Sequence, residues 1–294
     1  MVVKEDDSVY DIAKTLEAKG WWRMQRCSGF RKGCLIIKGQ MKPGTYLLST
    51  AYEPSRLLAI MAGDAEQEGR GLVIVEERMR TYINSLDMGN TDFLESLEKE
   101  ALSSGVPIIR REMQSFIKVL LAVKKPERIL EVGTAVGFST LLMCEYGPEK
   151  LQVTTIENYE KRIPIARENF AKAGRSHQIT LLEGDAGQIL RELEPGFDLI
   201  FMDAAKGQYI HWLEDAVRLL NPEGILLSDN VLQEGELIES RYLVERRNRT
   251  IYKRMRDYLY ALKHDERLLT SILPLGDGAA LSIRQPFGRG NVPQ

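Results

Sequence analysis

The stretch Arg128-Ile-Leu-Glu-Val-Gly-Thr-Ala-Val-Gly-Phe-Ser-Thr140 decides the fold of this chain. It predicts an apolar strand over 128–133, followed by a Gly-rich turn that leads directly into a helix. In a parallel α/β sheet, such a turn presents backbone N–H groups where a small-molecule cofactor binds. The spacing Gly133-x-x-x-Gly137 has Ala135 where a dinucleotide fold needs glycine beside the pyrophosphate, so NAD is disfavoured.

Strands and helices alternate through the following region, which predicts an α/β fold with a doubly wound, Rossmann-like parallel sheet. Further strands are expected at 151–157, 178–185, 197–203 and 224–230, with helices at 138–146, 160–173, 188–193 and 209–220. Two amphipathic helices, 90–102 and 107–123, precede the first strand, and Pro107 is expected at the start of the second. A last helix, 250–264, precedes a C-terminal antiparallel hairpin of 268–275 and 279–284.

The composition is that of an ordinary soluble globular protein, since 44% of the 294 residues are hydrophobic and 28% are charged. A formal net charge of −2 means that nucleic-acid binding would require a local basic patch. Cys27, Cys34 and Cys144 lack metal-type spacing, which favours a reducing compartment. We expect no membrane span and no signal segment, and therefore a cytoplasmic protein.

Four regions follow from these patterns: a small N-terminal α+β module (1–64), a charged linker (65–71), the α/β domain (72–285) and a tail (286–294). Within the module, Ser8-Val-Tyr-Asp-Ile-Ala-Lys-Thr-Leu-Glu-Ala-Lys-Gly20 and Lys42-Pro-Gly-Thr-Tyr-Leu-Leu-Ser49 are similar to the LysM-like module of YceG-like endolytic murein transglycosylases. Those proteins also have a membrane anchor and a catalytic domain, neither of which is expected here. The similarity therefore implies no activity on cell wall, and a packing role for the module is the simpler interpretation.

Acidic residues at the strand ends are candidate ligand contacts. Glu157 ends the second predicted strand, where a carboxylate can accept hydrogen bonds from both hydroxyls of a ribose. Asp185, followed by the small Ala186, ends the third strand and suits an adenine ring. Taken singly, such residues are also common in ordinary turns.

Three oxygen-bearing side chains end the next two predicted strands. Asp203 ends the fourth strand, and Asp229 and Asn230 end the fifth. Neighbouring parallel strands end at the same edge of a sheet, so these side chains would meet there and suit Mg²⁺ or Mn²⁺. An Asp-Asn pair that simply starts a turn is the alternative.

Glu131-Val-Gly-Thr-Ala-Val-Gly-Phe-Ser-Thr140 resembles the first motif of the cation-dependent O-methyltransferases, the family of catechol and caffeoyl-CoA O-methyltransferases, which have a class I methyltransferase sheet. The resemblance extends over about 91–283 and includes Val106-Pro-Ile-Ile109, Phe201-Met-Asp-Ala-Ala-Lys-Gly-Gln-Tyr209, Leu227-Ser-Asp-Asn230 and Leu273-Pro-Leu-Gly-Asp-Gly278. It implies a homodimer with S-adenosylmethionine (SAM) as cofactor. The implied cofactor contacts are Ile109, Gly133, Ser139, Glu157, Asp185, Ala186 and Asp203.

The same resemblance implies that Asp203, Asp229 and Asn230 hold the metal and that Lys206, with Asp203, is catalytic. Methyl transfer from a sulfonium is an in-line displacement, so a deprotonated oxygen must be aligned with the methyl group and water must be excluded. A metal ion lowers the pKa of the substrate hydroxyl, while a lysine removes the proton or holds the oxyanion. As an isolated feature, Lys206 would more often be a solvated surface residue.

A strongly basic stretch lies near the C-terminus of the domain. Its cations are Arg241, Arg246, Arg247, Arg249, Lys253, Arg254, Arg256 and Lys263, with Tyr242, Tyr252, Tyr258 and Tyr260 among them. Arginines with interspersed tyrosines suit a phosphate backbone with unstacked bases, as in an RNA loop, and Arg241, Arg246, Arg247 and Arg249 are the candidate contacts. A solvated helix face is the alternative.

Arg246-Arg-Asn-Arg-Thr-Ile251, together with Pro274-Leu-Gly-Asp-Gly278, most resembles the bacterial branch that methylates 5-hydroxyuridine in the tRNA anticodon loop to 5-methoxyuridine. The resemblance implies tRNA, and neither DNA nor a membrane, as partner. Methylation of catechol-like small molecules remains open as an alternative. A different class of function is also left open: a cell-wall-associated binding protein with a degenerate methyltransferase domain.

Overall fold

The computed structural model describes residues 2–3, 44–45, 77–238 and 247–286. The chain divides into two compact units, Met1–Gly71 and Leu72–Gln294. In the first unit, the described residues form an antiparallel pair of short strands, β1 (Val2–Val3) and β2 (Gly44–Thr45). The expected helix near residues 8–20, and most of the LysM-like module, lie outside the described residues.

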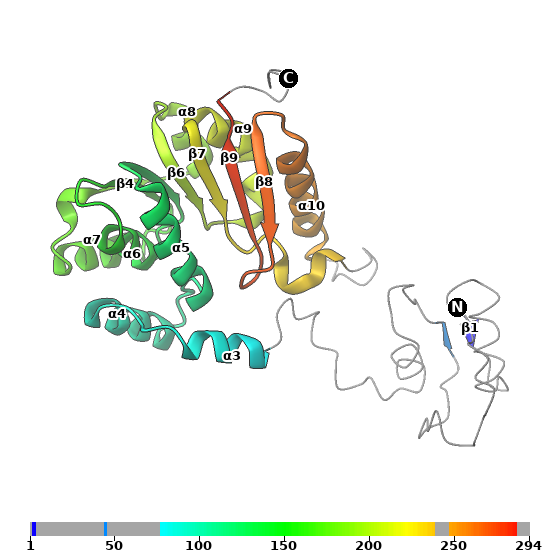
Figure 1. Cartoon of the computed structure of the whole chain (residues 1–294), viewed down its shortest axis with the longest axis horizontal. Helices are drawn as coiled ribbons and strands as arrows, with labels where there is room; N and C mark the ends of the chain where they lie inside the picture. The colour runs from blue at the N-terminus through cyan, green and yellow to red at the C-terminus, as the bar shows by residue number, and fades with distance from the viewer. Residues whose placement is uncertain (1, 4–43, 46–76, 239–246, 287–294) are drawn as a thin grey trace. The chain divides into compact units, whose positions relative to one another are not determined.

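A seven-stranded sheet forms the centre of the second unit (Figure 1). Its strand order is β5-β4-β3-β6-β7-β9-β8, and β9 runs antiparallel to both of its neighbours. The expected doubly wound sheet with a C-terminal hairpin is thereby confirmed. The strands are β3 (Arg128–Val132), β4 (Gln152–Glu157), β5 (Ile179–Glu183), β6 (Phe197–Met202), β7 (Leu220–Ser228), β8 (Leu268–Leu273) and β9 (Ala279–Arg284).

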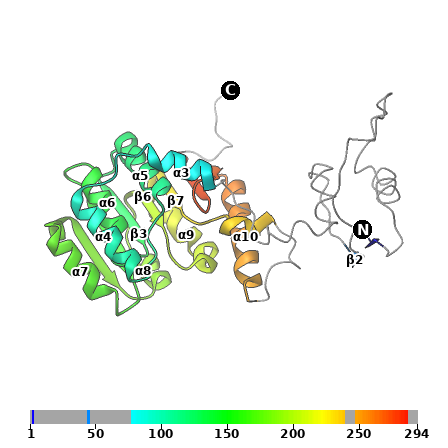
Figure 2. The same cartoon turned by 90° about the horizontal axis from the view of Figure 1, so that it is seen from below.

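Helices cover both faces of this sheet (Figures 1 and 2), because successive side chains of a strand point to opposite faces. Leu130 and Val132 of β3 pack with α8 (Ala186–Glu192), α9 (Tyr209–Leu219) and α10 (Arg249–His264). Ile129 of the same strand packs in the core formed with α4 (Asp92–Ser103), α5 (Arg111–Lys124), α6 (Phe138–Tyr146) and α7 (Ile163–Lys172). The remaining helical segments are α3 (Glu77–Ser85), η2 (Ser176–Gln178), η3 (Lys206–Gln208) and η4 (Gln233–Ile238). None of the helices in the described ranges is long and apolar enough to span a bilayer.

The register of four parallel strands aligns their carboxyl ends. Val132 of β3 is paired with Ile156 of β4 and Met202 of β6, and Met202 is paired with Ser228 of β7. The next residue along each strand is therefore at one level of the sheet, and these residues are Glu157, Gly133, Asp203 and Asp229. The chain reverses its winding direction between β3 and β6, which is the point where α/β sheets bind ligands.

Several helix boundaries differ from the prediction. The helix expected from Pro107 begins at Arg111, because Arg110 has extended backbone angles (φ −62°, ψ 153°) and 107–110 forms a connecting segment. The helix expected at 188 begins at Ala186, since the Asp185 carboxylate accepts a hydrogen bond from the backbone N–H of Gln188 and caps it. Helix α3 was not predicted.

Glu131 is a fully buried acid in the central strand β3. Its carboxylate accepts hydrogen bonds from the hydroxyls of Ser139 (2.5 Å), Thr155 (2.6 Å) and Thr140. Burial raises the pKa of Glu131 to about 7, against the opposing effect of the three hydroxyl donors. This network ties β3 to α6 and β4 directly beneath the Gly-rich turn.

The raised pKa of Glu131 predicts a pH-dependent stability. The folded protein keeps the proton of Glu131 at pH values where the unfolded chain, with its pKa near 4.5, has lost it. This carboxyl therefore stabilises the fold at low pH, and its contribution declines as the pH rises through 7. In Glu131→Gln this side chain no longer titrates. The difference between the free energies of unfolding of the variant and of wild type, measured by urea titration, should therefore rise by about 3 kcal/mol in favour of the variant between pH 4.5 and pH 8. Parallel pH curves for the two proteins would contradict the prediction.

Candidate functional site

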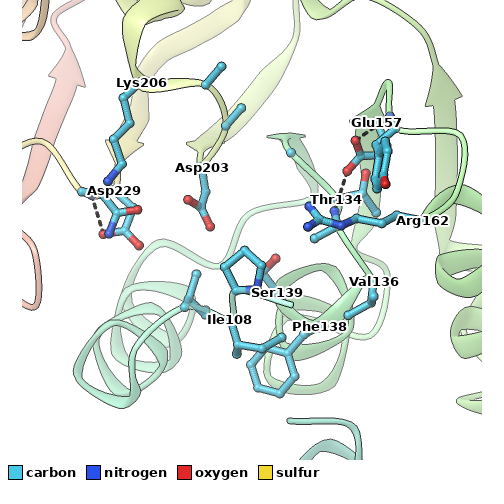
Figure 3. A pocket seen from close by; sticks show the side chains of 18 of the residues that line it. Ile108, Thr134, Val136, Phe138, Ser139, Glu157, Arg162, Asp203, Lys206 and Asp229 are labelled. Atoms are coloured by element: carbon cyan, nitrogen blue, oxygen red, sulfur yellow. Dashed lines mark hydrogen bonds between the residues drawn. The ribbon is translucent and has the colours of Figure 1, made fainter. Parts of the chain in front are cut away.

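A cavity of about 570 Å³ opens at the carboxyl edge of the sheet, beside the ends of β3 and β6. This volume suits a drug-sized ligand. Figure 3 shows Glu157 and Arg162 at one end of the cavity, Asp203, Lys206 and Asp229 at the other, and Ile108, Phe138 and Ser139 along one wall. The full lining comprises residues 107–110, 133–136, 138–139, 157–159, 162, 203–206, 229–230 and 277.

The Gly-rich turn forms the floor between the two ends of the cavity. The backbone N–H of Gly133 donates to the carbonyl of Ile156 (3.0 Å), and the N–H of Asp203 donates to the carbonyl of Val132 (3.0 Å). Gly133 has φ +108°, and a Cβ at this position would lie 2.1 Å from the Asp203 carbonyl oxygen. Only glycine lets the turn pass this close to the end of β6.

Glu157 is held at its end of the cavity by three backbone donors. One carboxylate oxygen accepts from the N–H of Ala135 (2.7 Å), and the other accepts from Asn158 (3.0 Å) and Tyr159 (2.9 Å). A carboxylate has about four lone-pair sites, so capacity remains for donors inside the cavity. Glu157 can therefore accept hydrogen bonds from a diol such as a ribose. The Arg162 guanidinium lies over the Tyr159 ring beside it, 5.3 Å from the centroid.

Two carboxylates and a lysine occupy the opposite end. Burial raises the pKa of Asp203, with Lys206 opposing. Burial and the neighbouring Asp203 carboxylate raise the pKa of Asp229, again against Lys206. The Lys206 side chain extends toward Asp229 (Figure 3).

These residues fit a divalent cation. Among the described residues, no donor is hydrogen-bonded to the Asp203 carboxylate, and the Asp229 carboxylate accepts only from the N–H of Asn230 (2.7 Å). Two such carboxylates, with the Asn230 amide also in the lining, leave oxygens directed into the cavity. In the described ranges no cluster of three or more His, Cys, Asp or Glu is arranged for a metal, so this candidate depends on two acids and an amide.

The Tyr209 hydroxyl fixes the loop that carries Asp203. It donates to the carbonyl of Met202 (3.1 Å) and accepts from the N–H of Ala204 (3.1 Å), on either side of Asp203. Tyr209 itself is fully buried at the start of α9. The orientation of the Asp203 backbone is thus set by packing in the core.

Arg110 and Asp277 form an ion pair in the cavity lining (3.0 Å). Arg110 immediately precedes α5, whereas Asp277 lies in the turn between β8 and β9, so the pair joins distant parts of the domain. Sequence reasoning missed Arg110, Tyr159, Arg162 and Asp277 as parts of the site. The only available signal was the expected Gly-Asp-Gly turn at 276–278.

The structure brings together eight of the residues predicted for the site. The cavity lining contains Ile109, Gly133, Ser139, Glu157, Asp203, Lys206, Asp229 and Asn230. Asp185 and Ala186 are outside the lining, because Asp185 caps α8 and Ala186 begins that helix. Their predicted contact with the cofactor therefore has no support from the cavity.

The basic stretch is only partly described. Arg247 and Arg249 lie at the start of α10, whereas Arg241 and Arg246 are outside the described residues. The expectation that Tyr252 and Tyr258 are available for stacking is wrong, because both rings are buried in the core as the apolar face of α10. Tyr260 is exposed and stacks on His264, with ring centroids 3.8 Å apart.

Comparisons with known proteins agree with this geometry. An O-methyltransferase family model matches residues 85–285. The chain is 31% identical to a catechol O-methyltransferase of Niastella koreensis, and the match covers 55% of this chain and 76% of the relative. It is also 31% identical to a caffeoyl-CoA O-methyltransferase of Populus kitakamiensis, over 58% of this chain and 74% of that relative. The structure of the SAH-bound methyltransferase PaMTH1 of Podospora anserina matches with a TM-score of 0.65 and 29% identity, over 72% of this chain and 95% of that one.

The closeness of Gly133 to the Asp203 carbonyl predicts that Gly133→Ala is severely destabilising. The added Cβ would clash with backbone that hydrogen bonds hold in place, so the free energy of unfolding should fall by about 3 kcal/mol or more. Gly174→Ala is the matched control, because Gly174 also has a positive φ (+68°) but nothing lies within 4 Å of its added Cβ. Equal losses in chemical denaturation of the two variants would show that the close approach is unimportant.

Proposed function

The chain belongs to the O-methyltransferase family, whose model matches residues 85–285, and from this premise we propose that it methylates the 5-hydroxyl of 5-hydroxyuridine at the wobble position of tRNA, giving 5-methoxyuridine. It is a SAM-dependent O-methyltransferase of the catechol and caffeoyl-CoA type. The choice of tRNA as substrate is the part that we propose. That substrate would place the enzyme in the cytoplasm.

The cavity suits SAM in size and chemistry. Glu157 would accept hydrogen bonds from the ribose hydroxyls, because its carboxylate is anchored by three backbone N–H groups and still faces the cavity. SAM supplies an electrophilic methyl group on sulfur when it is bound. Asp203, at the same level of the sheet as Gly133, would contact the cofactor at the opposite end.

The acidic end of the cavity suits Mg²⁺ or Mn²⁺, held by Asp203, Asp229 and Asn230. When bound, a divalent ion lowers the pKa of a coordinated hydroxyl. Lys206 lies beside both carboxylates and would take the substrate proton or stabilise the oxyanion through its charge. The apolar side chains of Ile108, Ile109 and Phe138 in the lining would limit the access of water to the displacement.

The observation that supports tRNA is the position of the basic helix α10 beside η3, the segment that carries Lys206. Its outer face exposes Lys253, Arg256, Tyr260 and Lys263. An anionic backbone on this face would be bound by the same helix that contacts the segment of Lys206, and Tyr260 offers an exposed aromatic surface for a base. In the substrate, the 5-hydroxyl and the adjacent 4-carbonyl oxygen resemble the paired oxygens of a catechol.

Methylation of a catechol-like small molecule is the second candidate, and it agrees with the names of the relatives, which are a catechol and a caffeoyl-CoA O-methyltransferase. Turnover of free catechols at micromolar concentrations would favour it. A cell-wall-binding protein with a degenerate methyltransferase domain is the third. The shared cavity lining of Asp203, Lys206, Asp229 and Asn230 argues against degeneration, and a peptidoglycan pull-down tests this alternative directly.

We also propose a homodimer formed through the apolar surface of α3 and α5. Large hydrophobic side chains are exposed there: Met79, Tyr82, Ile83, Leu86, Met88, Val119 and Val123. Next to them is an apolar groove of about 590 Å³ that reaches the turn residues Pro274 and Leu275. Exposed apolar patches of this kind mark interaction sites, and two-fold symmetric pairing is the most common form of self-association.

The proposed dimer predicts the effect of charge in this surface. Ile83→Asp combined with Val119→Asp should convert the dimer into a monomer in sedimentation velocity. The two introduced carboxylates would be buried in the dimer interface with no cation to pair with. Leu102→Asp on α4 is the control, since Leu102 is as exposed as Val119 but lies outside the patch. A monomeric wild type, or a dimer that survives the double substitution, would contradict the proposal.

Nucleoside mass spectrometry tests the proposed reaction. tRNA that carries 5-hydroxyuridine, incubated with the protein, SAM and Mg²⁺, should yield 5-methoxyuridine, and a chelator should abolish the product because the substrate oxygen then loses its activating cation. Reversing Arg246, Arg247 and Arg249 to Glu should weaken tRNA affinity about tenfold or more. Reversing Lys99, Lys150 and Arg191 is the matched control, since these exposed cations lie away from α10. SAM binding without tRNA methylation, or unchanged activity of the first variant, would favour the small-molecule alternative.

A further inference from the structure

Helix α10 contacts the segments that carry the acidic end of the cavity. It lies beside α9 (Figure 2), and it also packs against η3, β8 and η4. Its buried side chains Tyr252, Met255, Tyr258 and Leu262 belong to the core on this face of the sheet. The same helix therefore presents a basic outer face to solvent and an inner face to the elements that hold the reaction site.

Arg254 contacts the residue that follows Lys206. Its guanidinium donates a hydrogen bond to the carbonyl of Gly207 (3.2 Å), the residue that follows Lys206 in η3. Arg254 is half-buried, and a Cβ added to Gly207 would lie 3.7 Å from Cγ1 of Ile251 and 3.9 Å from Cδ of Arg254, so both side chains pack beside this residue. Arg254 was counted among the cations of the basic stretch, but its side chain is directed at the catalytic loop.

Two tyrosines connect α10 to the acidic ligands. The hydroxyl of Tyr258 is hydrogen-bonded to that of Ser228 (2.6 Å), which immediately precedes Asp229. The ring of Tyr258 meets that of Tyr209 edge to face, with centroids 5.6 Å apart. The Tyr209 hydroxyl is hydrogen-bonded to the backbone on both sides of Asp203. Helix α10 therefore supports the loops of Asp203, Lys206 and Asp229 together.

We propose that Arg254 is a positioning residue for Lys206, and that α10 holds the lysine loop and the two acidic strand ends in one arrangement. This inference rests on the proposed function in one respect, since it takes Lys206 as the group that acts on the substrate oxygen. Loss of the Arg254 hydrogen bond frees the Gly207 carbonyl and lets η3 move. Lys206 then loses its alignment with the substrate oxygen, while the Glu157 end of the cavity is unchanged.

This arrangement separates the effect of Arg254 on rate from effects on binding. The Arg254 guanidinium points inward to Gly207, so a tRNA on the outer face of α10 does not require it. The expected cofactor contacts Glu157, at the end of β4, and Gly133, directly after β3, lie on segments other than η3, to which the Arg254 guanidinium donates. Substitution should therefore slow methyl transfer and leave the affinities for SAH and tRNA intact.

Single-turnover methylation with saturating SAM and Mg²⁺ tests the proposal, with Arg254→Met, Arg254→Lys and the control Arg218→Met. Arg218 is matched because its guanidinium also donates to backbone carbonyls, those of Leu190 (2.7 Å) and Leu193 (3.0 Å) at the end of α8, so its removal frees carbonyls that are outside η3. We expect Arg254→Met to lower the rate constant about tenfold or more, because small misplacements of catalytic groups are costly. Arg254→Lys should recover most of the rate, since an ammonium can also donate to the Gly207 carbonyl.

Titration calorimetry with SAH, fluorescence anisotropy with tRNA and thermal melts of the same variants complete the test. The proposal requires that Arg254→Met retain both affinities within about twofold and melt like Arg218→Met. It is overturned if the rate constant of Arg254→Met equals that of Arg218→Met. It is also overturned if the rate falls together with SAH affinity and melting temperature, which would indicate general unfolding.

The experiment separates this inference from the proposed substrate. If wild type methylates catechol and no tRNA, the tRNA proposal fails, and the same variants are compared with catechol as substrate. The rate order wild type, Arg254→Lys, Arg254→Met is then still required, because Lys206 acts on the reacting oxygen of either substrate. Equal rates for all three proteins with catechol would overturn the role of Arg254.

Discussion

The approach of the Gly133 backbone to the carbonyl of Asp203 is the constraint on which the site depends. It brings the ends of β3 and β6 into contact at the point where the sheet reverses its winding. Backbone hydrogen bonds between neighbouring strands align Glu157 with Gly133 on one side, and Asp229 with Asp203 on the other. Glu157, which we propose binds the ribose diol, and Asp203 and Asp229, which we propose hold the metal ion, thus face one cavity because four strands end together.

Glu131 of β3 lies two residues before Gly133, and the burial of its carboxyl group carries a desolvation penalty. Its buried carboxyl holds the Gly-rich turn to α6 and β4 through three hydroxyl groups, none of which carries a charge. An apolar residue would remove the desolvation penalty but would leave those hydroxyls without an acceptor. The turn is therefore held by Glu131, a carboxyl group that changes its protonation state near pH 7.

Sequence patterns predicted the sheet and most of the site because strand ends in a parallel sheet are fixed by local periodicity. Glu157 is the last residue of an apolar strand, and Asp203 and Asp229 each directly follow one, so their meeting required only the strand order. Arg110 and Asp277 could not be found this way, since their contact joins a connecting segment to a distant hairpin turn. Tyr252 and Tyr258 were counted among the aromatic residues available to RNA, but the helical phase of α10 places both in the core and leaves Tyr260 exposed.

The position of β9 has a consequence for biosynthesis. This strand is the last of the sheet to be translated, yet it lies between β7 and β8 and supplies the partners of both. Until residues 279–284 leave the ribosome, β7 has an open edge, and β8 has no strand to pair with in the sheet. A chain truncated before residue 279 would therefore leave the edge of β7 unpaired, and exposed strand edges of this kind promote aggregation.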